Sequence, residues 1–441
     1  MILAMAMQAA TAVPPRPRPR PAPAEETISY VVKPRDTLDR LSRSFLVPAQ
    51  TWKKLLPLAR IRDPHRLPIG RTLVIPRSWL RFTVEPAQLA SYRGTIMVAI
   101  DGRAVPPTIG GTIGEGAQIS TAANSFVTLI LADRSKLVIP SQSKVTVRQL
   151  RRILLTGTME YRVDVEAGRV ETKVTPLPSP QDRYRIGTPI SLTAVRGTEF
   201  RVGYDTGPRL AAAEVLSGTV AVSRPDGAAM QLVDHAYGAT TDAGGVTTLA
   251  ALLPAPDLLD PGKLQTADSV EFHVTPIEGA ARYRVVLASD AGFVENLAEQ
   301  IADGRDFALT DVPNGNLFIR VSAIGGNGLE GLAQAFSFTR RLASIHAEAK
   351  QEADGFRFRW FGAGGGKRRY RFQLMNGSLD SRAIVDEVGL TRDEVMLRNL
   401  PPGTYYWRVG LSQTDESGEA ESWTNPEKLT ITAPGKRGRS K

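Results

Sequence analysis

The stretch AVRGTEFRV, residues 194–202, alternates apolar and charged side chains. Phe200 and Val202 alternate with Glu199 and Arg201, and a period of two residues is that of a β-strand with one buried and one polar face. A glycine precedes the alternating part, where a chain often turns before a strand begins. The stretch therefore predicts a half-buried strand.

The same alternation extends in both directions, from about residue 85 to residue 225. Glycine-containing turns separate the alternating segments, which are residues 126–131, 144–148, 161–166 and 170–174. Many short strands at this spacing predict an all-β domain built as a sandwich, a barrel or a β-roll.

Residues 105–225 resemble the FecR domain. The residues that carry the resemblance are GTIGEG at 111–116, ISTA at 119–122, DRSKLV at 133–138, EAGRV at 166–170, GTP at 187–189 and the stretch 194–202. FecR proteins relay a signal through one membrane helix to a cytoplasmic region. This sequence has neither that region nor an apolar run of about 20 residues. The resemblance therefore implies an all-β FecR-type domain at 85–225 and a periplasmic setting, without the relay.

Residues 28–77 show a different pattern, with helical spacing between two short apolar runs. Tyr30 to Val32 read as a strand, and LVIP at 73–76 reads as a second strand that ends at proline. Asp36 is placed to cap a helix, since a short acidic side chain can accept the first free amides. The apolar residues at helical spacing are Leu38, Leu41 and Phe45, then Trp52, Leu55, Leu56 and Leu58. The segment predicts the order β-α-α-β.

This segment resembles a LysM domain, on YVVKPRDTL at 30–38 and DPHRLPIGRTLVIP at 63–76. It departs at Arg35, where such domains carry glycine. LysM domains bind N-acetylglucosamine polymers in a shallow groove between two loops. Carried over to this sequence, one wall is Asp36, Thr37 and Leu38, and the other is Arg62, Asp63, Pro64 and His65.

A purely structural interpretation of these residues stays open. Asp36 and Thr37 can serve only to cap the first helix, and Leu38 can belong to the core. His65 can be an ordinary surface histidine.

Residues 226–262 are rich in Ala, Gly and Pro and predict a linker. Beyond them the sequence repeats weakly, because RYRVVL at 282–287 parallels RYRFQL at 369–374, an offset of about 87 residues. The repeats resemble fibronectin-III β-sandwiches at 263–340 and 345–432. LPPGTYYWRV at 400–409 is the strongest part, and Tyr405 stands where such sandwiches place a tyrosine that ties a loop to the sheet. Trp360 and Trp407 are predicted to be core residues.

The two ends of the chain carry part of its net charge of +10. Met1–Ala12 is apolar and precedes a Pro/Arg-rich stretch at 14–24, so residues 1–24 predict an export signal and a spacer, with a disordered start as the alternative. Residues 433–441 form a basic tail. Without a nucleic-acid-binding motif, this charge does not predict a nucleic-acid partner.

No catalytic chemistry is evident in the sequence. Cysteine is absent, and none of the four histidines pairs with another at metal spacing. No nucleophile elbow, zinc-protease motif or phosphate-binding loop is present. The chain is therefore predicted to be a non-enzymatic protein without cofactor or metal.

The leading hypothesis is a periplasmic cell-envelope protein. Its LysM domain would bind peptidoglycan or another N-acetylglucosamine-containing glycan, and its β-domains would face an envelope protein partner. Neither nucleic acid nor a transmembrane helix is expected. The alternatives are a FecR-like periplasmic sensor or regulator that acts through a separate membrane protein, and a wall hydrolase.

Overall fold

The computed structural model describes residues 25–59, 63, 67–260, 263–415 and 418–432. The predicted export signal, spacer and basic tail lie outside these residues. The chain divides into two compact units, which are described separately: the first runs to Phe82 and includes Ile153–Gly157, and the second holds Thr83–Arg152 and everything from Thr158 on. The prediction of a mainly β chain with a small βααβ segment is confirmed.

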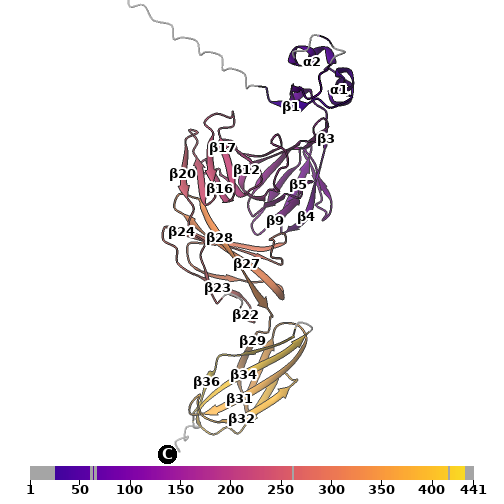
Figure 1. Ribbon diagram of the computed structural model, residues 1–441. Helices are drawn as coiled ribbons and strands as arrows, with labels where there is room; N and C mark the ends of the chain where they lie inside the picture. Colours follow the sequence, from indigo (N-terminus) through magenta and orange to yellow (C-terminus); the bar gives the residue numbers. More distant parts are fainter. Residues whose placement is uncertain (1–24, 60–62, 64–66, 261–262, 416–417, 433–441) are drawn as a thin grey trace, which may run out of the picture. The chain divides into compact units, whose positions relative to one another are not determined.

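The first unit is built on a two-stranded antiparallel sheet covered by two helices (Figure 1). Its elements are β1 (Thr27–Val31), α1 (Leu38–Phe45), α2 (Trp52–Ala59), β2 (Thr72–Pro76) and the 3-10 helix η1 (Arg77–Trp79). Helix α1 begins one residue later than predicted, because its cap is Thr37 and not Asp36. The Thr37 hydroxyl accepts a hydrogen bond from the Arg40 amide at 3.1 Å.

The core of the first unit receives residues from a distant part of the chain. Buried apolar side chains come from both strands and both helices, and they pack with Ile153 and Leu155. Those two residues belong to the segment Ile153–Gly157, and the Leu154 amide donates to the Arg81 carbonyl at 3.0 Å. The unit is therefore larger than the segment 28–77 that the sequence pattern delimits.

The FecR-type part of the second unit consists of two sheets that share β12 (Met159–Lys173). One sheet has the order β6 (Arg103–Val105), β5 (Ile96–Ile100), β8 (Gln118–Thr121), β11 (Lys144–Ile153), β12, β13 (Arg183–Gly187), β14 (Leu192–Val195), β17 (Thr219–Ser223) and β18 (Gln231–Asp234). The other has the order β7 (Thr112–Ile113), β4 (Ala87–Arg93), β9 (Phe126–Ile130), β10 (Lys136–Ile139), β12, β15 (Glu199–Asp205), β16 (Leu210–Ser217), β19 (Tyr237–Thr241) and β20 (Thr247–Ala251). Strand β3 (Phe82–Val84) precedes them.

Strand β12 passes from one sheet to the other at Gly168. Ala167 pairs with Lys144 of β11, whereas Gly168 pairs with Tyr204 of β15. Gly168 has φ +73°, and a Cβ there would lie 2.5 Å from the Gln142 carbonyl oxygen. Glycine is therefore required for the passage. The sequence predicts two strands separated by a turn at this glycine, and the structure has one long strand.

Residues 226–262, predicted to be a linker, contain strands β18, β19 and β20, which extend the two sheets. The small residues that suggested a linker are needed for close packing instead. A Cβ at Gly238 would lie 2.9 Å from side-chain carbons of Leu252 and of Leu329, the latter from the following sandwich. Glycine is therefore needed at position 238, because the first sandwich approaches the sheet there.

The C-terminal half of the second unit contains two β-sandwiches. The first packs β21 (Leu258–Leu259), β23 (Val270–Val274) and β26 (Asp306–Leu309) against β22 (Leu264–Gln265), β28 (Glu330–Arg340), β27 (Gly315–Gly325), β24 (Ala280–Ala288) and β25 (Asn296–Ala302). The second packs β29 (Ile345–Glu352), β30 (Gly355–Gly362) and β33 (Glu394–Arg398) against β32 (Ala383–Leu390), β31 (Lys367–Asn376), β34 (Gly403–Asp415) and β35 (Gly418–Trp423), and β36 (Glu427–Ile431) pairs with β34. Each has its own core.

Two expectations for the second sandwich are confirmed. The Tyr405 hydroxyl donates to the Pro401 carbonyl at 2.8 Å and so ties the preceding loop to the sheet. Trp360 and Trp407 are buried in the core. Trp423 is exposed.

Candidate functional site

The segment that leaves β1 and the segment 67–71 that enters β2 lie side by side in the first unit, next to the predicted walls of the groove. Strands β1 and β2 are antiparallel with Val31 opposite Thr72, so the loop that leaves β1 and the loop that enters β2 meet at one end of the sheet. The Val32 amide donates to the Arg71 carbonyl at 2.9 Å, and the Gly70 amide donates to the Val32 carbonyl at 2.9 Å. These bonds join the two loops where they meet the sheet.

Asp36 of the first wall organises its own loop. Its carboxylate accepts the Lys33 amide at 2.7 Å and the Tyr30 hydroxyl at 2.7 Å. Burial, followed by the hydrogen bond to Asp36, raises the pKa of Tyr30 to about 12. The Tyr30 hydroxyl therefore remains protonated at physiological pH and can donate to Asp36.

Thr37 and Leu38 complete this wall in different ways. The Thr37 side chain is exposed even though its oxygen caps α1. The Leu38 side chain is buried in the core, so only its backbone is near the loop surface. Of the three residues, Thr37 thus presents the most accessible side chain.

The second wall is described in part. Asp63 is exposed, while Arg62, Pro64 and His65 lie outside the described residues. Ile69, which the sequence interpretation did not single out, is 67% exposed in the turn before β2. Its sequence signal is an apolar residue between Pro68 and Gly70, since a side chain in such a turn does not reach the core.

Arg35 keeps the turn that glycine makes in LysM domains. Its φ is +71°, in the left-handed region that glycine occupies without strain. The Arg35 side chain is exposed. Arg35 therefore adopts a conformation that glycine adopts readily, and it adds a positive charge beside the predicted groove.

A second notable arrangement is a buried ion cluster where the FecR-type sheets meet the first sandwich, near β16 and β28 in Figure 1. Glu171 of β12 and Arg201 of β15 are neighbours across the sheet. Arg284 of β24 donates to Glu171 at 2.5 Å and to Glu330 of β28 at 3.2 Å. Arg201 lies 3.3 Å from the Glu330 carboxylate and donates to the Gly331 carbonyl at 3.0 Å.

The carboxylates of this buried ion cluster are held ionised. Burial by itself would raise the pKa of Glu330, but the charges of Arg201 and Arg284 outweigh it and lower the pKa below its ordinary value. The pKa of Glu171 is lowered in the same way, against its burial, by Arg320 and Arg284. Removing one member of such a cluster leaves an uncompensated buried charge, which costs several kcal/mol.

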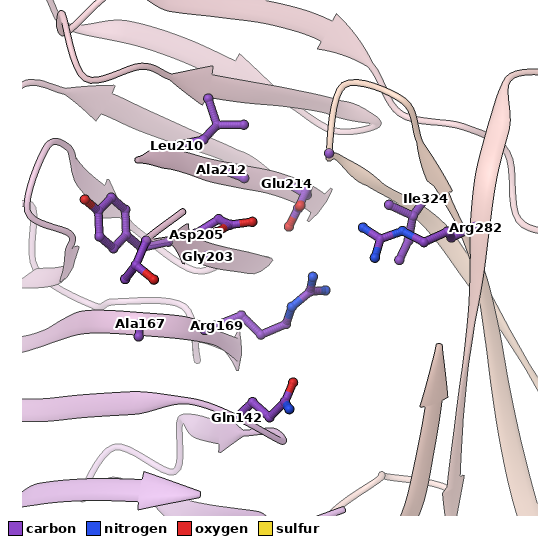
Figure 2. A pocket seen from close by; sticks show the side chains of 14 residues that line it. Gln142, Ala167, Arg169, Gly203, Asp205, Leu210, Ala212, Glu214, Arg282 and Ile324 are labelled. Carbon is purple, nitrogen blue, oxygen red and sulfur yellow. The ribbon is translucent and has the colours of Figure 1, made fainter. Parts of the chain in front are cut away.

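A pocket of about 340 Å³ adjoins the buried ion cluster. Figure 2 shows Arg169 and Glu214 from the FecR-type sheet facing Arg282 and Ile324 of the first sandwich. Burial raises the pKa of Glu214, whose carboxylate accepts the Glu330 amide at 3.2 Å. Because Glu214 bonds to the interface and Arg169 pairs with Glu330, these groups serve the contact between the sheets.

The buried ion cluster is not predicted by the sequence pattern. Glu171 and Arg201 occupy polar positions of alternating strands, which normally face water. The pattern predicts which residues share a face, but not that another domain covers it.

The described part of the chain contains no group of three or more His, Asp or Glu side chains placed to hold a metal ion. Within the same residues, no helix has the length and apolar character that crossing a bilayer requires.

Comparison with known families confirms two of the resemblances seen in the sequence. Residues 30–76 match the LysM domain, and residues 117–221 match the family of the FecR protein. Comparison with curated proteins finds no match.

Among solved structures, a protein assigned as an anti-sigma factor from Parabacteroides distasonis is 16% identical, with a TM-score of 0.26, over 30% of this chain. The chain spans 59% of the length of that protein. A two-domain fibronectin type-III segment of chicken tenascin is 14% identical over 41% of this chain and 99% of its own, with a TM-score of 0.21. Fibronectin(III)-like modules of Clostridium thermocellum CbhA are 11% identical over 40% of this chain and 94% of their own, with a TM-score of 0.18.

Proposed function

We propose that this chain, with its LysM domain at 30–76 and its FecR domain at 117–221, is a non-catalytic peptidoglycan-binding protein of the bacterial cell envelope. The LysM domain holds it on wall glycan, and the β-domains that follow face an envelope protein partner. Export through the N-terminal segment, residues 1–24, is part of the proposal.

The observation that carries the proposal is the adjacency of the two loops in a domain that matches LysM. The bonds between Val32, Gly70 and Arg71 join the two loops where they meet the sheet, which supports a preformed site. A preformed site binds a flexible glycan at a lower entropic cost than a site that must order itself.

Sugar recognition would divide between polar and apolar groups of the two loops. Backbone groups at Asp36 to Leu38, the Thr37 side chain and Asp63 would hydrogen-bond acetamido groups. Ile69 offers an apolar side chain to the face of a sugar ring. Arg62, Pro64 and His65 belong to the same proposed site through the LysM resemblance.

Co-sedimentation of the full chain with purified peptidoglycan sacculi tests the proposal. The full chain is the right probe because Ile153 and Leu155 complete the core of the first unit. We expect the wild type to sediment and Ile69→Asp to weaken binding about tenfold, since contact of one aliphatic side chain contributes about 1.5 kcal/mol.

Ile109→Asp is the matched control, because Ile109 is a similarly exposed isoleucine in the second unit. It should sediment like the wild type. A wild-type chain that stays in solution, or equal losses for the two variants, would overturn the proposal.

The FecR match favours a second function, a periplasmic regulator that acts through a separate membrane protein. Deletion of the gene would then change the transcription of a defined gene set, and Ile69→Asp would leave that set unchanged. A wall-anchored scaffold predicts instead that deletion and Ile69→Asp share one envelope phenotype.

A further inference from the structure

The two sandwiches carry side chains of the same charge at equivalent positions on the outer face of their larger sheets. Strand pairing establishes the equivalence: Arg284 is opposite Ser322 in the first copy, as Arg371 is opposite Gly410 in the second. The equivalent pairs are Arg284 and Arg371, Glu299 and Asp386, Arg320 and Arg408, and Glu330 and Glu421. The repeat therefore preserves a pattern of surface charge as well as the core.

In the first copy this face is covered by the FecR-type sheet. Arg284 donates to Glu299 of its own sheet at 2.5 Å and to Glu171 of β12 at 2.5 Å. Arg320 donates to the second oxygen of the Glu171 carboxylate. One carboxylate from a neighbouring strand is thus held between two arginines, and the Arg284 side chain is only 1% exposed.

In the second copy the same arginines are present without that cover. Arg371 donates to Asp386 at 2.8 and 2.7 Å, which repeats the bond from Arg284 to Glu299. The Arg371 side chain is 43% exposed. The ion pair that orients Arg284 in the first copy therefore has a counterpart in the second copy, where no FecR-type sheet buries the arginine.

An exposed aromatic residue, Trp423, lies within about 6 Å of both arginines of the second copy. The guanidinium of Arg408 is 4.7 Å from the centroid of the Trp423 ring, and that of Arg371 is 5.9 Å from it. A hollow of about 320 Å³ opens beside Trp423 and Arg371. Val388, 70% exposed on the edge strand β32, also lines it.

We propose that this outer face, centred on Arg371, Arg408 and Trp423, is a docking surface for a protein that presents an aspartate or glutamate from a β-strand. The partner's carboxylate takes the place that Glu171 has in the first copy. Its neighbouring side chains pack on Trp423 and Val388. The proposal deepens the partner half of the proposed function and does not depend on glycan binding.

The chemistry of the face selects this occupant. Two neighbouring arginines, one oriented by Asp386 and the other by Gln373, suit an acidic partner, and an aromatic ring with an aliphatic neighbour suits a protein surface. A second copy of this chain is disfavoured, because its own Glu171 is already bound to Arg284 and Arg320.

Photo-crosslinking in the cells that produce the protein tests the proposal. A photoreactive amino acid replaces Val388, and the peptide that it captures is identified by mass spectrometry. We expect an adduct with an Asp- or Glu-bearing strand of a different protein. Arg371→Gln together with Arg408→Gln should lower its yield about tenfold, as loss of charge-assisted bonds does.

Arg359→Gln is the control, because Arg359 is an exposed, ion-paired arginine on the opposite sheet of the same sandwich. It should leave the adduct unchanged, and thermal melting should show that every variant is folded. In a charge-exchange test, the Asp or Glu of the partner is replaced by arginine. Arg371→Glu should then restore crosslinking to this partner variant.

An adduct with a second copy, nucleic acid, glycan or lipid would overturn the proposal. The absence of any adduct would also overturn it. So would a protein adduct whose yield is unchanged by Arg371→Gln together with Arg408→Gln. Sedimentation with sacculi should be normal in all these variants. If crosslinking fails while sedimentation is normal, the proposed docking surface is contradicted. If sedimentation fails while crosslinking is normal, the proposed glycan binding is contradicted.

Discussion

At the scale of single residues, Arg35 tests how strictly the first loop needs its turn. A non-glycine residue at φ +71° costs roughly 1 kcal/mol relative to glycine. We therefore expect Arg35→Gly to raise the free energy of unfolding of the first unit by about 1 kcal/mol. Hydrogen exchange of its amides in the full chain would measure the change.

The same substitution at Arg40, an exposed position inside α1, is the control. Glycine in a helix interior costs about 1 kcal/mol, so Arg40→Gly should be destabilising. Equal losses of stability in Arg35→Gly and Arg40→Gly would contradict the account of the turn.

Single residues also show where the sequence interpretation reached its limit. That a short polar residue caps α1 is predictable from the pattern, but not whether Asp36 or Thr37 does so, because both side chains can accept the first amides. Ile69 was missed because its exposure depends on the path of the turn, and apolar residues are ordinarily assigned to a core.

At the scale of elements, the segment Ile153–Gly157 is predicted to hold the first unit together. Leu155 is 7% exposed in that core, whereas the adjacent Leu154 is 41% exposed. Truncating a buried leucine costs about 2–5 kcal/mol. Leu155→Ala should therefore destabilise the first unit by that amount, measured by hydrogen exchange of residues 25–59.

Leu154→Ala is the matched control and should change the stability by less than about 0.5 kcal/mol. If Leu155→Ala were equally mild, the first unit would be complete without this segment.

Most strands of the second unit follow the period-two pattern, so their positions are predictable from the sequence. Two elements were not predictable from this pattern, and both depend on glycine. Gly168 was assigned to a turn, yet β12 runs through it from one sheet to the other. Residues 226–262 were assigned to a linker because of their small side chains, which instead permit the close approach of Leu329 at Gly238. Composition does not distinguish a flexible glycine from a tightly packed one.

At the scale of the whole molecule, the buried ion cluster makes the second unit sensitive to acid. The pKa values of Glu171 and Glu330 lie below the ordinary 4.5 in the folded chain, so the unfolded chain binds more protons as the pH falls. Their stabilisation is fully present above about pH 4.5 and is lost progressively below it. We expect the melting temperature of the second unit to fall over that range.

Glu330→Gln should lower the stability at neutral pH by roughly 3–5 kcal/mol and weaken the acid dependence, because one titrating group and its pairing are gone. Glu387→Gln, which breaks the exposed pair with Arg392, should cost no more than about 1 kcal/mol. Identical pH profiles for the wild type and Glu330→Gln would show that the cluster does not control acid stability.

The contact between the FecR-type sheets and the first sandwich was not predictable from the pattern. Charged residues at alternate strand positions have the same sequence signature whether they face water or a second domain. The repeat helps after the structure is known, since it shows that Arg371 and Arg408 correspond to arginines that already hold a carboxylate.

The central claim, recognition of N-acetylglucosamine by the first unit, is tested most directly by calorimetric titration of the full chain with chitin oligomers. Cello-oligomers of equal length, which lack the acetamido groups, serve as the comparison. We predict heat of binding for the chitin oligomers and none for the cello-oligomers. No heat from the chitin oligomers, or equal heat from both sugars, would contradict the claim.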